Sequence, residues 1–226
     1  MHNNIIEACN KYMLTNENMS KTVKINPSKK KENRTLSKER VNISVPQNVD
    51  DLFWCFYIIL NGEHSYAIDN SFKKEKEFKI ECIEKLRKIK SELKAFKLRL
   101  NEIENELLNE KKITIKTLVA LCLLYKINIL YVWNRKYIEI INNPDETINI
   151  ILNENMEHKI SYDTNITKVN YYRENYWFIE NVSKPLKGIT NYTHSELLTI
   201  ANKLDIIDMN NKKTKKEIYE KILEKI

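Results

Sequence analysis

Two helix-start signals of the same kind occur in the last part of the chain, residues 187–226, and they constrain its fold more than any other stretch. Thr193 and Glu196 have the spacing of a capping box, in which the threonine hydroxyl accepts from a backbone N–H three residues later and the glutamate accepts from the N–H of the cap itself. Thr214 and Glu217 repeat that spacing. Apolar residues recur every three or four positions after each signal, so the sequence predicts two short amphipathic helices joined by an extended connector. The apolar positions are Leu197, Ile200, Ala201 and Leu204 in the first helix and Ile218, Tyr219, Ile222 and Leu223 in the second.

Lysines surround the predicted start of the second helix, at Lys212, Lys213, Lys215 and Lys216 beside Thr214. A cation at this end opposes the helix macrodipole, which costs about 0.3–1 kcal/mol per charge. We interpret this placement as a binding site for an anion, because the free N–H groups of a helix start suit a phosphate oxygen and lysines neutralise a phosphate backbone without strict geometry. The alternative interpretation is a solvated, lysine-rich turn on a small structural cap.

The helix–extension–helix pattern of 187–226 resembles the SAP and Rho-N-terminal-like class of small nucleic-acid-binding motifs. The resemblance rests on the start Ser195-Glu196-Leu197, on the Ala201-x-x-Leu204 turn and on the Lys-Thr-Lys-Lys-Glu sequence that begins the second helix. It implies a small all-α module that holds DNA through backbone phosphates. The nucleic-acid-binding residues predicted on this basis are Lys212, Lys213, Thr214, Lys215 and Lys216.

A net charge of +7 over 226 residues suits a nucleic acid or another acidic surface, although charge speaks to association and not to fold. The hydrophobic fraction of 42% is sufficient for a core in part of the chain. Only two glycines occur, so glycine-rich phosphate loops and dinucleotide-binding fingerprints are absent, which excludes most nucleotide-binding enzymes. We therefore predict no cofactor.

The four cysteines, Cys9, Cys55, Cys82 and Cys122, are far apart, and no pair has the spacing of a zinc ribbon or of a disulfide framework. The sequence therefore predicts no metal site and a reducing compartment. The N-terminus has no apolar run suited to a signal peptide, and the longest apolar stretches are shorter than the about 20 residues needed to cross a bilayer. We expect a soluble, intracellular protein with no membrane partner.

The composition divides the chain before the C-terminal module into two parts. Residues 1–47 are polar and basic with little apolar periodicity, which predicts a disordered basic arm. The run VDDLFWCFYIILNG then marks the start of a folded domain at 48–180. An aspartate, Asp50 or Asp51, can cap a helix predicted at 52–60.

Residues 73–109 are helical and charged, with apolar residues at alternating steps of three and four, the pattern of a coiled-coil seam. One interpretation is a continuous helix that pairs with a second copy of the chain and gives a homodimer. The other, which we favour because few heptads are sustained, is a break near 94–98 into two helices that fold back on the core of the domain. The seam residues are Leu86, Ile89, Leu93, Phe96, Leu100, Ile103 and Leu107.

The rest of the domain changes from helical to β-rich patterning. Thr114 can cap a buried helix that follows it, and two β-rich runs separated by a polar turn then predict a hairpin. The predicted strands lie at 127–133, 137–141, 148–152, 158–162 and 176–179. Helices followed by strands indicate an α+β domain, rich in helix, with a small mixed or antiparallel sheet. Residues 181–186 form the predicted linker to the C-terminal module.

Cys55 is the candidate catalytic residue, because it lies one turn into the predicted helix, where proximity to a helix N-terminus lowers the pKa of a thiol. The order of elements over 48–180, with the stretches DLFWCF and ENYWFI, resembles papain-like and OTU-type cysteine proteases. The resemblance implies a cysteine protease or deubiquitinase with Cys55 as nucleophile. However, Asn175 stands where an OTU-type enzyme has its catalytic histidine, and no glycine precedes the cysteine. An inactive relative of that scaffold and an unrelated domain with a core cysteine are the alternatives.

Aromatic residues cluster near the end of the domain and include an arginine. Such a cluster can form a surface on which nucleic-acid bases stack. The alternation of a strand would place half of these side chains in the core. The cluster consists of Tyr171, Tyr172, Arg173, Tyr176, Trp177 and Phe178.

These observations together predict a non-enzymatic, DNA-binding accessory protein that holds nucleic acid through its C-terminal module. The whole chain, including the DDLFWCFYIILNG opening, is similar to uncharacterised proteins of the nucleocytoplasmic large DNA viruses. That resemblance implies a viral factory in the host cytoplasm or the virion, with the nucleus as a further location. The alternatives are a cysteine hydrolase and a structural protein that dimerises through the seam.

Overall fold

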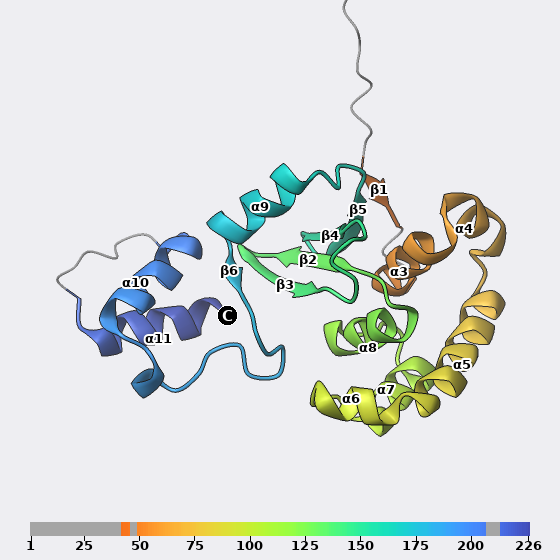
Figure 1. Ribbon diagram of the computed structural model, residues 1–226, viewed down its shortest axis with the longest axis horizontal. Coiled ribbons are helices and arrows are strands. Elements are labelled where there is room, and N and C mark those ends of the chain that lie inside the picture. The colour runs from red at the N-terminus through yellow and green to blue at the C-terminus, as the bar shows by residue number, and fades with distance from the viewer. Residues whose placement is uncertain (1–41, 46–48, 207–212) are drawn as a thin grey trace, which may run out of the picture. The chain divides into compact units, whose positions relative to one another are not determined.

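The computed structural model describes residues 42–45, 49–206 and 213–226 (Figure 1). Most of the predicted arm, 1–47, and Lys212 lie outside these residues. Residues 40–226 form one compact unit, and the predicted α+β class is confirmed. The helices are α3 (Asp51–Asn61), α4 (Glu63–Asp69), α5 (Phe72–Lys88), α6 (Lys90–Ala95), α7 (Leu100–Asn109), α8 (Ile115–Tyr125), α9 (Ile166–Asn175), η1 (Ile189–Asn191), α10 (His194–Lys203) and α11 (Lys215–Lys225). The strands are β1 (Ile43–Ser44), β2 (Ile129–Trp133), β3 (Lys136–Ile140), β4 (Asn149–Glu154), β5 (Glu157–Ser161) and β6 (Trp177–Phe178).

The strands form one mixed sheet in the order β1-β5-β4-β2-β3-β6. The antiparallel pair β2–β3 is the predicted hairpin, and β4–β5 is a second one. Two parallel pairings, β2 with β4 and β3 with β6, connect these hairpins and the last strand. Each hairpin turns through two residues with positive φ, Asn134-Arg135 and Asn155-Met156. Such turns match the right-handed twist of the strands they join.

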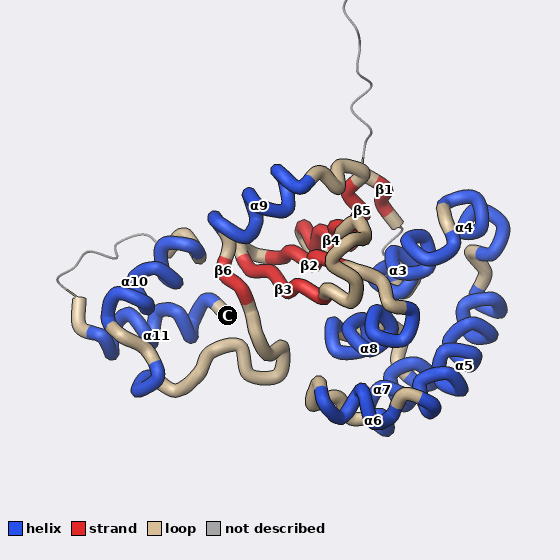
Figure 2. Tube along the Cα trace, in the orientation of Figure 1, coloured by secondary structure: helices blue, strands red, loops and turns tan. Residues whose placement is uncertain are grey.

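The alternation of side chains along the strands divides the interior into two cores, one on each face of the sheet. On β2, Ile129 and Tyr131 belong to the larger core, which contains α3 and α8. Leu130 and Val132 belong to the smaller core, which α9 covers with Tyr172. Figures 1 and 2 show the strands between these helices. The domain therefore has three layers. In the part of the chain that is described, no helix has the length and apolar character needed to span a bilayer.

Helix α3 is central to the larger core and confirms the helix predicted at 52–60. Asp50 caps it by accepting from the N–H of Phe53 at 3.3 Å. Gly62, with φ of 84°, follows its last residue, a backbone conformation that glycine adopts without strain. Every residue from Asp51 to Ile58 is buried, so the first two turns of α3 are enclosed on all sides.

Helix α9 was not predicted from the sequence. Its residues, ITKVNYYREN, include threonine, asparagine and tyrosine, which have weak intrinsic helix propensity. Packing of Val169 and Tyr172 against the sheet stabilises the helix despite this weak intrinsic propensity. Within the aromatic cluster, strand alternation therefore applies only to Trp177, which is buried, and Phe178, which is exposed, because Tyr171, Tyr172 and Arg173 lie on α9.

The chain turns between α6 and α7, as the favoured interpretation of 73–109 predicted. Lys97 adopts the left-handed conformation, and the N–H of Leu98 donates to the carbonyl of Leu93 at 2.9 Å, as in a Schellman turn. The seam residues therefore do not lie on one continuous helix, and among them only Phe96 is exposed, at 58%, so a homodimer through the seam stays a prediction. A dimer through the seam would withdraw four side chains from the core of their own chain. The four are Leu86, Leu93, Ile103 and Leu107.

The C-terminal module has the two helices that its capping boxes predicted. In both α10 and α11, the threonine and the glutamate make the reciprocal hydrogen bonds of the box. The predicted linker, 181–186, does not behave as a free tether. Leu186 is buried in the larger core and Val182 packs against it. The module is therefore continuous with the domain that precedes it.

The capping box of α10 leads to a first prediction. Thr193→Ala is expected to lower the free energy of unfolding by about 1 kcal/mol, because the N–H of Glu196 loses its hydroxyl acceptor at 3.2 Å. Thr199→Ala is the matched control, since that hydroxyl lies in mid-helix and donates to the carbonyl of Ser195, and alanine favours helix. Urea unfolding of both variants measures the difference. Equal destabilisation of the two would contradict a capping role.

Candidate functional site

Two adjacent residues of the β2–β3 hairpin hold the C-terminal ends of α10 and α11. Arg135 Nε donates to the carbonyl of Lys203, the last residue of α10, at 3.1 Å. Lys136 Nζ donates to the carbonyls of Lys225 and Ile226 at the end of α11, at 3.4 and 3.1 Å. Cations stabilise the negative end of a helix dipole and satisfy its last carbonyls. The C-terminal ends therefore contact the hairpin, and the N-terminal ends lie about one helix length away from it, roughly 15 Å.

The N-terminal ends of α10 and α11 lie beside each other. His194 Nε2 is 2.8 Å from the carbonyl oxygen of Lys213, so the first residue of α10 contacts the segment that starts α11. Figure 1 shows the two helices side by side. Hydrogen bonds with Thr193 lower the pKa of Glu196, and the charge of Lys215 contributes to the same shift. The positive ends of two helix dipoles are thus brought together with lysines.

The predicted phosphate-binding residues differ in their surroundings. Thr214 is committed to its capping box: its N–H donates to the Glu217 carboxylate at 2.7 Å, and its hydroxyl accepts from the N–H of Glu217 at 3.4 Å. The hydrogen bonds that the backbone and hydroxyl of Thr214 make to the Glu217 carboxylate lower its pKa. Lys216 lies 3.8 Å from Glu220 in an exposed pair, which contributes little stability. Thr214 therefore builds the helix start, and the lysines carry the charge.

Cys55 is fully buried in the larger core. Burial raises the pKa of its thiol, and the nearby carboxylates of Asp51 and Asp50 raise it further. Among the described residues, no histidine hydrogen-bonds to its sulfur. Asn175 ends α9 and donates to a carbonyl of the same helix, so its position does not open a strand. These surroundings oppose the thiolate that a cysteine nucleophile requires.

A hydrogen-bonded chain of polar residues lies near Cys55 and was not predicted. The Asp51 carboxylate is 2.8 Å from His158 Nδ1, and His158 Nε2 is 2.9 Å from the hydroxyl of Tyr131. Asn153 Nδ2 donates to the same hydroxyl at 3.0 Å. Burial alone would raise the pKa of Asp51, but hydrogen bonds with His158 and Lys112 lower it to about 2. The ionised carboxylate favours the proton on Nδ1, so that Nε2 accepts from Tyr131.

A second polar cluster is buried at the start of α3. Lys79, which is fully enclosed, donates to the carboxylates of Asp50 at 2.6 Å and Glu75 at 2.7 Å. The indole N–H of Trp54 donates to Glu75 at 3.1 Å, and the N–H of Ile113 donates to Asp50 at 3.0 Å. Burial raises the pKa of Asp50, although Lys79 opposes the shift. The cluster connects α3, α5 and the segment before α8.

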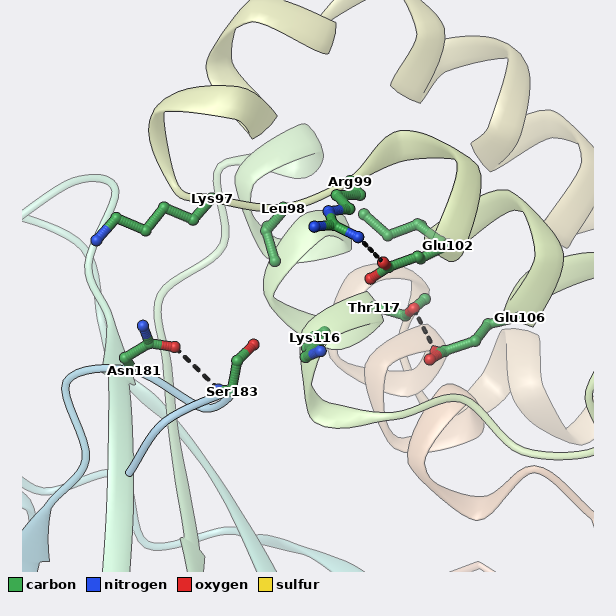
Figure 3. A pocket seen from close by; sticks show the side chains of 10 residues that line it. Lys97, Leu98, Arg99, Glu102, Glu106, Lys116, Thr117, Asn181 and Ser183 are labelled. Carbon is green, nitrogen blue, oxygen red and sulfur yellow. Dashed lines mark hydrogen bonds and ion pairs between the residues drawn. The ribbon is translucent and has the colours of Figure 1, made fainter. Parts of the chain in front are cut away.

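Two hollows border the N-terminal end of α8. One, of about 350 Å³, is lined in part by Tyr131, Asn153 and His158. The other, of about 370 Å³, lies between α7, α8 and the segment at 181–183. Figure 3 shows that Glu106 and its hydrogen bond to Thr117 border the second hollow. Glu106 accepts from the backbone N–H of Thr114 and from the hydroxyls of Thr114 and Thr117, so its carboxylate is engaged at the start of α8.

Most residues that hold these sites could not be recognised in the sequence. Arg135 lies in the hairpin turn and Lys136 begins β3, where cations are ordinary, and the partners of both residues are distant in the chain. Within the described ranges, no cluster of three or more histidine, cysteine, aspartate or glutamate residues is suited to a metal ion. No protein-family model matches the chain, and neither a curated protein nor a solved structure shows significant similarity to it.

Proposed function

We propose that the protein binds nucleic acid, DNA in particular, through phosphate contacts at the paired N-terminal ends of α10 and α11. The observation that carries the proposal is the contact between His194 and the backbone of Lys213, which places both helix starts at one end of the module. The negative ends of the same helices are neutralised by Arg135 and Lys136. The arrangement therefore places the positive ends of both helix dipoles on one side of the module.

Several lysines and both helix dipoles contribute to the charge at this end of the module. Glu196 and Glu217 satisfy their own helix starts, so their charges are partly offset by the helix dipoles. Lys213, Lys215 and Lys216 then add charge that the dipoles disfavour. A polyanion relieves that repulsion and releases its counterions when it binds.

The test uses the full chain and a duplex oligonucleotide. A variant with Lys212, Lys213, Lys215 and Lys216 changed to Gln is expected to bind more weakly. The slope of its salt dependence should fall by up to about 0.9 logarithmic units for each phosphate that the protein no longer neutralises. The matched control changes four exposed lysines of α5 and α6 to Gln and has the same net charge. The control lysines are Lys73, Lys74, Lys88 and Lys90.

Binding measured by fluorescence anisotropy at several salt concentrations separates the outcomes. A large loss of affinity in the first variant and a small loss in the control support the proposal. Equal losses would mean that only net charge matters, and unchanged, salt-insensitive binding would rule out phosphate contacts at this site.

The proposed role is non-enzymatic. The cysteine-hydrolase alternative has no observation in its favour, because the Cys55 thiol is buried and the His158 ring contacts Asp51, Tyr131 and Asn153 instead. A viral setting for the protein, in the virion or a viral factory, stays a prediction from sequence resemblance.

A further inference from the structure

Three aromatic rings are exposed along one edge of the sheet, where α9 and β6 meet. Tyr171 is 52% exposed and Phe178 is 43% exposed, and Tyr176 between them is partly exposed. We refer to Tyr171, Tyr176 and Phe178 as the aromatic ledge. It lies beyond the smaller core, on the face of the sheet that α9 covers. Large apolar side chains at an edge strand favour association with another molecule.

Buried rings hold the aromatic ledge in place. Tyr176 packs edge-on against Tyr172, with ring centroids 5.1 Å apart, and Tyr171 lies 6.2 Å from Tyr176. Phe178 lies 5.3 Å from Tyr137. Tyr137 and Tyr172 already close the smaller core. The exposed rings are therefore positioned on a rigid base and contribute little to the core themselves.

Cations border the aromatic ledge on the side of the C-terminal module. The guanidinium of Arg135 lies 5.2 Å from the ring centre of Tyr176. Lys203 Nζ donates to the carbonyl of Arg173, and Arg135 donates to the carbonyl of Lys203. Within the described residues, neither Arg135 nor Lys203 pairs with a carboxylate. Arg173 is neutralised by Glu139, and Glu174 is the exposed carboxylate of α9.

Helix α10 connects this surface to the lysine end of the module. Its last residue, Lys203, contacts Arg135 and Arg173 beside the aromatic ledge, and its first residue, His194, contacts Lys213. The helix has 10 residues and is therefore about 15 Å long. A flexible polyanion bound at the lysines can reach the rings along one helix.

We propose that the aromatic ledge stacks unpaired bases of a single-stranded nucleic acid whose backbone also contacts the lysines at the start of α11. The proposal rests on the phosphate site described above and specifies its ligand. Bases within a duplex are stacked on each other and cannot cover a protein ring, whereas unpaired bases stack on aromatic side chains regardless of sequence. The cationic side chains of Arg135 and Lys203, which pair with no carboxylate among the described residues, favour a polyanion over an apolar protein surface.

The test compares a single-stranded oligothymidylate with a duplex of the same length, using the full chain. The double variant Tyr171→Ser/Phe178→Ser removes two exposed rings and leaves Tyr137, Tyr172 and Tyr176 in place. Single-stranded binding is expected to weaken by about 10-fold or more, since each stacked ring contributes roughly 5- to 150-fold. The salt dependence stays unchanged, because no phosphate contact is removed. Duplex binding changes by less than about twofold.

Two controls keep the result interpretable. Tyr171→Phe/Phe178→Tyr retains both rings and is expected to bind the single strand normally. Phe72→Ser removes an exposed ring from α5, far from α9 in the sequence, and is also expected to bind normally. All the substituted side chains are exposed, so each variant is expected to fold, and thermal unfolding checks this.

The outcomes separate the two proposals. Unchanged single-stranded binding in the serine double variant would overturn the proposal that bases stack on the aromatic ledge, and it would leave the proposed lysine site unaffected. Equal weakening of single-stranded and duplex binding would also overturn it, because stacking on exposed rings requires unpaired bases. Loss of binding in the aromatic variant but not in the lysine variant would overturn the phosphate site instead. Absence of binding to either oligonucleotide would overturn both.

Discussion

Lys79→Met is expected to lower the free energy of unfolding by about 3–5 kcal/mol. This is the largest loss of stability that we predict for a single substitution. The ammonium of Lys79 is enclosed and bonds to Asp50 and Glu75 at 2.6 and 2.7 Å. Its removal leaves two carboxylates buried together without a counter-charge. Burying carboxylates without a counter-charge destabilises the folded protein far more than burying the intact ion pair does.

The pH dependence of this variant provides a second readout. Buried carboxylates without a cation have raised pKa values, so the variant recovers stability when they are protonated at low pH and loses it as the pH rises. The deficit relative to the wild type is therefore smaller near pH 4 than near pH 8. Lys73→Met, an exposed lysine of the same helix, is the control and is expected to change stability by less than about 0.5 kcal/mol. A deficit for Lys79→Met similar to that of the control would contradict the role assigned to the cluster.

Asp51→Asn is expected to destabilise the protein by about 2 kcal/mol at neutral pH. Asp51 is buried, and its carboxylate accepts from Lys112 at 2.8 Å and from the backbone N–H and Nδ1 of His158 at 3.2 and 2.8 Å. Its pKa of about 2 lies below the value near 3.9 of an unfolded aspartate. A depressed pKa gives stability that is present above pH 4 and is lost as the pH falls towards 2.

The difference in unfolding free energy between the wild type and Asp51→Asn reports on Asp51 alone, because the other carboxylates are the same in both proteins. Unfolding measured between pH 2 and pH 7 is expected to show a gap of about 2 kcal/mol above pH 5 that narrows below pH 4. Asp145→Asn, in an exposed turn, is the control and is expected to leave no such gap. A gap that stays constant down to pH 2 would show that Asp51 acts through shape alone and not through its charge.

Local signals in the sequence account for the elements that were predicted correctly. The capping boxes at Thr193 and Thr214 each involve residues within one helical turn, so their consequences can be derived from spacing. The β2–β3 hairpin likewise follows from two neighbouring runs and a short turn. The break near Lys97 was predicted only from the limited length of the seam, since no glycine marks it.

The elements that were not predicted depend on interactions between distant residues. Lys79 lies in a charged helix, where a lysine is normally exposed, and only its pairing with Asp50, 29 positions earlier, explains its burial. His158 faces Asp51 across 107 positions. Cys55 was considered a nucleophile from its place near a helix start, but the surrounding layers enclose it.

The hydrogen bonds of Arg135 and Lys136 with the ends of α10 and α11 also order the steps of folding. They join residues 68 to 90 positions apart, so they close long loops, which form slowly. We expect the β2–β3 hairpin to form first and the two helices to dock on it late. On partial opening the same helices would detach first, so their amides exchange hydrogen faster than those of β2. The end of the module that we propose as the nucleic-acid site would thus belong to the last part of the protein to assemble, and a ligand bound there would slow the detachment of the two helices.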